Sequence, residues 1–184
     1  MIDQAKIRSA IRLYLEGIGE DPNREGLLGT PDRVARMCEE VFGGIDRDAR
    51  DLMGAVFTEK YNDIVLIRDI PFNSMCEHHL MPFEGKAHIA YLPAGKIVGL
   101  SKLTRLVNCF AARLQVQERL TQQIAGSLRE HLKPRAVGVI LTCRHMCMES
   151  RGIAVAGEET VTSAMLGDLE TNQAQRAEFL SLVA

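Results

Sequence analysis

The fold is decided by residues 85–148, which read GKAHIAYLPAGKIVGLSKLTRLVNCFAARLQVQERLTQQIAGSLREHLKPRAVGVILTCRHMCM. Residues 85–92 alternate between two faces, which is the period of a β-strand. Two helical patterns follow over residues 101–110 and 120–132, because apolar side chains recur there every three or four positions. Residues 137–148 are apolar and β-branched at their start, which predicts another strand. The stretch therefore predicts strand, helix, helix, strand.

The flanking segments add a strand on each side of this unit. A β-branched run covers residues 63–70, and residues 152–157 with 160–164 supply further strand after the unit. The order becomes ββααββ. Strand pairs that flank a helix pair favour an α+β fold over a sheet in which strands and helices alternate.

Helices are expected at both ends of the chain. A first helix begins after Asp3, a second has Thr30 as its N-cap and Pro31 at its first position, and a third covers Asp48 to Val56. A last short helix covers residues 174–183. We therefore expect an N-terminal helical segment over residues 1–60, followed by one compact core over residues 61–184.

The bulk composition excludes several classes of function. The 184 residues hold 22 Lys and Arg against 24 Asp and Glu, so a net charge of -2 gives no general attraction to nucleic acid or membrane. No apolar run approaches the roughly 20 residues of a membrane helix, and the opening MIDQAKIRSA is unlike a signal peptide. We expect a cytoplasmic protein that binds neither nucleic acid nor membrane.

Two segments concentrate soft metal ligands. In SMCEHHLMPFEG, Cys76 and His79 have the i, i+3 spacing with which a tight turn aims a thiolate and an imidazole at one cation. In LTCRHMCMESRG, strand alternation puts Cys143, His145 and Cys147 on one face. A single cysteine in a cytosolic protein is more often a small buried hydrophobe. Two such clusters in one chain favour zinc.

The number of ligands separates a catalytic zinc site from a structural one, because a structural site closes with four protein ligands and a catalytic site keeps one position open. The economical set is Cys76, His79 and Cys147, with Cys143 as a spare. His78 is then left beside the metal, as is His145, and both imidazoles can exchange protons near neutral pH.

Two helix starts carry candidate substrate contacts. Ser101 can cap a helix whose free N–H groups attract anions, with Lys102 and Arg105 on one side; the alternative is a solvated basic first turn. Glu118 can accept the two N–H donors along one edge of guanine, and Gln117 can complete the match. Ordinary helix surface is the alternative for that pair.

Taken together, these motifs closely resemble the GTP cyclohydrolase I family. The resemblance runs through EDPNREGLLGTPDRVARM, SMCEHHLMPFEGKAHIAYLP, GLSKLTRLV, LQVQERLTQQIA and RHMCMESRGI. It implies N-terminal helices before a ββααββ tunnelling fold that forms a barrel on oligomerisation. It also implies a homodecamer of two pentamers, with active sites at subunit junctions.

The family pattern implies a role for each matched residue and a reaction on GTP. Zinc would bind Cys76, His79 and Cys147; His78 and His145 would be catalytic, with Ser101 on the ribose side; Glu118, with Gln117 beside it, would hold guanine; and Lys102, Arg105 and Arg151 would hold the triphosphate. The implied reaction opens the imidazole ring of GTP by hydrolysis, releases formate and yields 7,8-dihydroneopterin triphosphate. Glu149 and Ser150 depart from the family pattern beside Arg151.

Two other functions compete with this one. Another tunnelling-fold enzyme, such as a pterin synthase or a nitrile reductase, would share the purine-like ligand and the glutamate, although the Cys76 and Cys147 pair argues against both. A noncatalytic zinc or nucleotide-binding module would show four protein ligands on the metal.

Overall fold

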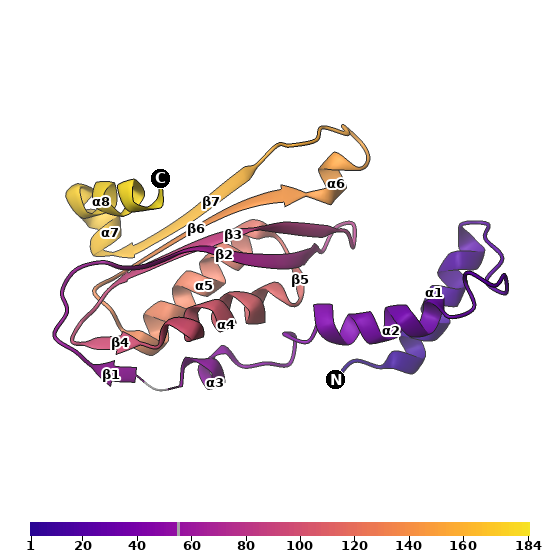
Figure 1. Cartoon of the computed structure of the whole chain (residues 1–184), viewed down its shortest axis with the longest axis horizontal. Helices are drawn as coiled ribbons and strands as arrows, with labels where there is room; N and C mark the ends of the chain where they lie inside the picture. The colour runs from indigo at the N-terminus through magenta and orange to yellow at the C-terminus, as the bar shows by residue number, and fades with distance from the viewer. Residues whose placement is uncertain (55) are drawn as a thin grey trace.

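A five-stranded sheet forms the centre of this computed structural model, which describes residues 1–54 and 56–184 (Figure 1). The strands lie in the order β5-β2-β3-β6-β7, and neighbours are antiparallel except for the parallel pair of β5 and β2. They are β2 (Val65–Cys76), β3 (Pro82–Leu92), β5 (Leu114–Gln115), β6 (Ala136–His145) and β7 (Thr160–Gly167). The helices α4 (Leu100–Ala111) and α5 (Gln117–Leu132) lie between β3 and β6 in the chain. The predicted α+β class and ββααββ order are confirmed.

The helices α4 and α5 cover one face of the sheet (Figure 1). Strand alternation turns Ala87, Ile89 and Tyr91 of β3 toward these helices, where they are buried with Leu103 and Ile124. Burying one large apolar side chain stabilises a fold by roughly 1.5–3 kcal/mol. This layer is therefore the main core.

The opposite face of the sheet is covered in part by α7 (Asp168–Thr171) and α8 (Gln173–Val183) (Figure 1). Leu169 and Phe179 from these helices are fully buried against Ala90 and Ile140. Gly138 permits the approach, because a Cβ at that position would lie only 2.8 Å from Phe179 Cε1. A side chain at position 138 would push α8 off the sheet.

Two helices, α1 (Gln4–Gly17) and α2 (Thr30–Val41), pack on each other beyond one end of the sheet (Figure 1). Asp3 caps α1 as predicted, because its side chain accepts a hydrogen bond from Lys6 N at 3.1 Å. Among the apolar residues of α1 and its C-cap, Leu15 is buried, whereas Tyr14 and Ile18 are exposed. Within the described residues, no helix is long and apolar enough to cross a membrane.

The predicted third helix is shorter than expected. The helix α3 covers Ala49–Met53, and Asp48 caps it by accepting from Arg50 N at 2.9 Å. Val56 begins a short strand, β1 (Val56–Thr58), which pairs with β4 (Lys96–Val98), and Ala55 lies outside the described residues. Neither three-residue strand has enough length to show a period in the sequence.

Several predicted boundaries are wrong at their ends. The strand expected over residues 63–70 runs on to Cys76. A strand tolerates Pro71 here because this residue follows a bulge between Ile67 and Ile70 and lies at an open edge, since β5 pairs with β2 only at residues 75–76. Residues 152–157 form turns rather than strand. The positions expected as N-caps, Thr30 and Ser101, lie inside helices whose N-caps are the preceding glycines at 29 and 99.

Candidate metal centre and active site

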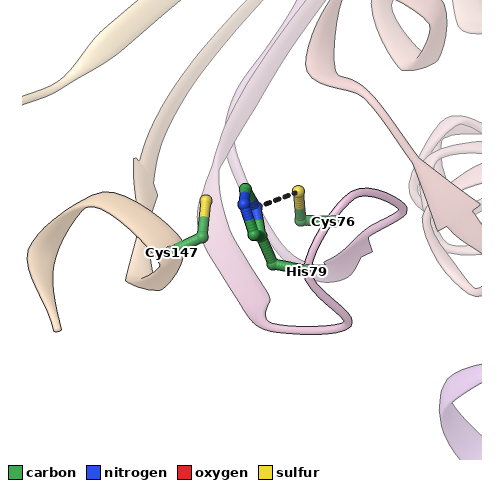
Figure 2. A group of neighbouring side chains, drawn as sticks. All are labelled: Cys76, His79 and Cys147. Carbon is green, nitrogen blue, oxygen red and sulfur yellow. Dashed lines mark hydrogen bonds between the residues drawn. The ribbon is translucent and has the colours of Figure 1, made fainter. Parts of the chain in front are cut away.

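The turn between β2 and β3 brings two predicted ligands together. Cys76 is the last residue of β2, and the tight turn that follows closes with hydrogen bonds from Leu80 N to Cys76 O and from Cys76 N to Met81 O. This reversal points His79 back at the end of the strand. Cys76 Sγ lies 3.9 Å from His79 Nδ1, as the dashed line in Figure 2 shows.

Cys147 completes the group from a second element. The expectation that Cys143, His145 and Cys147 share one strand face is wrong, because β6 ends at His145 and Cys147 lies in the short helix α6 (Met146–Glu149). The turn of α6 carries the thiol toward the β2–β3 turn (Figure 2). The ligand atoms of Cys76, His79 and Cys147 all lie within 4.8 Å of one another.

This group has the donor set of a zinc site, and one of its pairs has nearly the spacing that such a site requires. Ligand atoms at zinc–sulfur and zinc–nitrogen distances of about 2.3 and 2.0 Å, in tetrahedral arrangement, lie roughly 3.5–3.8 Å apart. The 3.9 Å between Cys76 Sγ and His79 Nδ1 is close to that spacing. Within the part of the chain that the structure describes, no fourth cysteine, histidine or carboxylate joins the group. The geometry fits three protein ligands with one open position.

The other cysteine of this segment belongs to the core. Cys143 is 1% exposed and packs among the side chains between the sheet and α5. Burial raises the pKa of its thiol to about 12, so it stays protonated at neutral pH. The pKa of Cys147 is also raised, first by burial and then by the neighbouring Cys76. Two neighbouring thiols that must both lose their protons are suited to a cation that compensates both negative charges.

His145 is held by a buried amide. Gln117, which is 2% exposed, donates from Nε2 to Leu141 O at 3.1 Å and to Thr160 O at 2.9 Å. These two carbonyls fix the orientation of the amide, so its Oε1 accepts from His145 Nε2 at 2.8 Å. The hydrogen of neutral His145 therefore lies on Nε2, and its Nδ1 has a free lone pair.

The surroundings of His145 favour its neutral form. Its ring stacks on Phe83 with centroids 4.8 Å apart and planes 14° apart. Burial lowers the pKa of His145, and the nearby carboxylate of Glu118 opposes this shift. The predicted guanine contact Glu118 is exposed at the first turn of α5, one residue after Gln117. The amide of Gln117, by contrast, uses its donor and its acceptor inside the protomer.

The remaining histidine of the turn faces outward. The side chain of His78 is 64% exposed, and its Nε2 lies 3.9 Å from Glu77 Oε1. Glu77 itself forms a two-pronged ion pair with Arg119, in which Arg119 Nη2 donates to Glu77 Oε1 at 3.0 Å. Arg119, which the sequence did not single out, thus ties the metal-binding turn to the start of α5.

The predicted phosphate contacts do not converge within one protomer. Ser74 Oγ donates to Ala111 O at 2.7 Å, which places the C-terminal end of α4 beside the end of β2. Ser101 lies ten residues before Ala111, and at 1.5 Å per helical residue this is roughly 15 Å further along α4. Lys102 lies beside Gly54, and Arg105 lines a cavity of about 660 Å³. Ser101 and Lys102 are therefore remote from the metal group of the same chain, whereas Arg105 lies roughly 9 Å along α4 from Ala111.

Arg151 is the predicted phosphate contact that does lie near the metal group. It follows α6 directly, and it is exposed. Its positive charge also lowers the pKa of Cys147, although this is the smallest of several effects on that thiol. The neighbouring Glu149 does not turn toward it, because that carboxylate pairs with Arg144.

The chain is similar to proteins of one family along almost its whole length. The family model described as GTP cyclohydrolase I matches residues 7–184. The GTP cyclohydrolase 1 of Nitrosospira multiformis is 66% identical over 170 residues, which cover 91% of this chain and 89% of that protein. The GTP cyclohydrolase 1 of Carboxydothermus hydrogenoformans is 54% identical over 184 residues, which cover 100% of this chain and 96% of that protein. A crystal structure of an archaeosine synthase described as QueF-like aligns with a TM-score of 0.49, at 18% identity, over 59% of this chain and 97% of that one. The chain belongs to the GTP cyclohydrolase I family.

Proposed function

We propose that the chain is a zinc-dependent GTP cyclohydrolase I, which hydrolyses the imidazole ring of GTP, releases formate and forms 7,8-dihydroneopterin 3'-triphosphate. The observation that carries the proposal is the gathering of Cys76, His79 and Cys147 from two separate elements. Family membership, with 66% identity to the GTP cyclohydrolase 1 of Nitrosospira multiformis, supports the same activity. A site with three protein ligands is the arrangement of a catalytic zinc.

In this proposal Cys76, His79 and Cys147 would hold a zinc ion. As a Lewis acid, the ion would lower the pKa of a water molecule bound to it. His145 exchanges a proton with the purine at Nδ1, because Gln117 fixes the other ring hydrogen on Nε2. The lowered pKa of His145 leaves Nδ1 free to accept a proton at neutral pH. His78 is the second candidate proton carrier.

Recognition of GTP is assigned to the two helix starts and to Arg151. Glu118 accepts the two N–H donors of guanine, with Gln117 beside it, whereas adenine offers no such pair of donors. Lys102, Arg105 and Arg151 hold the triphosphate, and Ser101 acts on the ribose side. The positive charges are suited to phosphate oxygens.

The distance along α4 supports a site completed by a second copy of the chain. Ser101, Lys102 and Arg105 of one protomer would meet the metal group of its neighbour, because roughly 9–15 Å of helix separates them from Ala111, at the end of α4 beside β2, within one protomer. The exposed apolar side chains of α1 would also find partners in an assembly. We propose a homodecamer of two pentamers whose sheets close into a barrel, with residues 1–60 as a helical segment and residues 61–184 as the catalytic core, acting in the cytoplasm.

The test is incubation of the purified protein with GTP while formate and the fluorescent oxidised neopterin are recorded. Both products should appear in equal amounts, and a chelator should abolish both until zinc is restored. ATP should yield neither product. A zinc-loaded protein that releases no formate from GTP would refute the proposal and would favour a noncatalytic zinc module.

A further inference from the structure

An ion pair closes over the helix that carries Cys147. Arg144 is the second-last residue of strand β6. It donates from Nε to Glu149 Oε1 at 2.9 Å and from Nη2 to Glu149 Oε2 at 2.6 Å. Glu149 ends α6, and its side chain is only 10% exposed. A two-pronged guanidinium–carboxylate pair fixes both direction and distance, unlike a contact between two point charges. Glu149 is therefore held on the Arg144 side of α6.

Glu149 has a competing partner two residues along the chain. Arg151 is exposed, and within the described residues it has no acidic group within ion-pair distance. A carboxylate that is not held elsewhere will pair with a nearby guanidinium, and it then competes with any anionic ligand for the same donors.

We propose that Arg144 is a positioning residue that sequesters the Glu149 carboxylate, so that Arg151 stays available to the triphosphate of GTP. The inference rests on the proposed function, because that proposal makes Arg151 a phosphate contact. Arg144 is neither one of the three metal-binding residues nor one of the proposed substrate contacts. Its proposed role is to hold the Glu149 carboxylate away from Arg151. A second carboxylate, that of Glu84, lies 3.9 Å from Arg144 Nη1.

The chain offers a matched control for the effect of charge alone. Removing Arg144 frees two acids, Glu149 and Glu84, and leaves the region one positive charge poorer. Glu149→Gln and Glu84→Gln each restore that charge in the Arg144→Ala background. Only Glu149→Gln removes the carboxylate that lies two residues from Arg151 in the chain. The two double variants therefore separate sequestration of Glu149 from general electrostatics.

The experiment measures the affinity of inorganic triphosphate, GTP and guanosine for zinc-loaded wild-type protein, Arg144→Ala and the two double variants. Arg144→Ala should weaken triphosphate and GTP about fivefold, the scale of one exposed ion pair, while guanosine changes by less than about twofold. Glu149→Gln should return the triphosphate affinity to within about twofold of wild type. Glu84→Gln should leave it weak. Zinc content, measured for each protein, should be unchanged.

The inference would be overturned by wild-type affinity in Arg144→Ala, by equal recovery in both double variants, or by recovery in neither. Equal recovery would mean that Arg144 acts through net charge, and no recovery or a loss of zinc would mean that it serves only the folding of α6. Wild-type protein that binds no inorganic triphosphate would overturn it as well. Wild-type protein that binds triphosphate but releases no formate from GTP would refute the proposed function alone and leave the inference standing.

Discussion

Replacing Gln117 with leucine should lower turnover far more than it weakens GTP binding. The amide of Gln117 accepts from His145 Nε2 at 2.8 Å and donates to two backbone carbonyls, Leu141 O at 3.1 Å and Thr160 O at 2.9 Å. Leucine has a similar volume and makes none of these hydrogen bonds. His145 then loses the acceptor that fixes the position of its ring hydrogen.

The size of the effect follows from the groups left without partners. Thr160 O and His145 Nε2 lose their partner at a cost of about 1–3 kcal/mol each when water does not replace the amide, whereas Leu141 lies in a strand that is paired on both sides. We expect a loss of about 2–4 kcal/mol in the free energy of unfolding, which for a chain of this length lowers Tm by roughly 5–15 °C. A general acid or base that is out of place lowers kcat by roughly 10²-fold.

A matched control is provided by Gln115, which is also fully buried and donates from Nε2 to Phe110 O at 2.9 Å and to Gln123 Oε1 at 2.7 Å. Gln115→Leu should lower Tm comparably and leave kcat within about twofold of wild type. Steady-state kinetics by neopterin fluorescence, with thermal unfolding of both variants, measures the two effects. Equal kcat in the two variants would refute the positioning of His145. A rise in KM at unchanged kcat in Gln117→Leu would mean that the amide binds the base instead.

Three further predictions address the metal, the substrate and the core thiol. Cys147→Ser should lose zinc and activity while the oligomer stays assembled, whereas Cys143→Ser should keep its zinc; full zinc in Cys147→Ser by metal analysis would disprove its role as a ligand. Glu118→Gln should weaken GTP and guanosine alike, whereas Lys102→Ala should weaken GTP far more than guanosine, and the opposite pattern in binding titrations would reverse the two assignments. Iodoacetamide at pH 8 should leave Cys143 unlabelled in the folded protein, because burial raises the pKa of this thiol to about 12 and only the thiolate reacts. Mass spectrometry measures the labelling, and a rate equal to that in urea would contradict the burial of Cys143.

The order of the elements could be predicted from the sequence because the apolar pattern continues over many residues in each of them. The alternation of Ala87, Ile89 and Tyr91 and the helical repeat through Ile124 correspond to buried faces in the structure. The extension of β2 to Cys76 was not accessible, because its second half contains Pro71 and polar residues that resemble a loop. It is strand because β3 pairs with it, which is a nonlocal cause.

The candidate site divides in the same way. The i, i+3 spacing of Cys76 and His79 predicted their proximity, since a single tight turn brings them together. The helix that carries Cys147 was missed, because continued alternation gave the same residue a reasonable place on a strand. The pairs of Arg119 with Glu77 and of Gln117 with His145 join residues 42 and 28 positions apart, and no local pattern indicates such contacts.

The length of α4 has a genetic consequence if a second copy completes each site. A subunit with a damaged metal group and a subunit with a damaged Lys102 carry defects in different halves of the site. Mixed in one ring, the two inactive chains would form some sites from two intact halves, so activity would return without either mutation being repaired. Conversely, a chain with both defects would inactivate sites on both of its sides, and it would act as a dominant inhibitor of wild-type subunits.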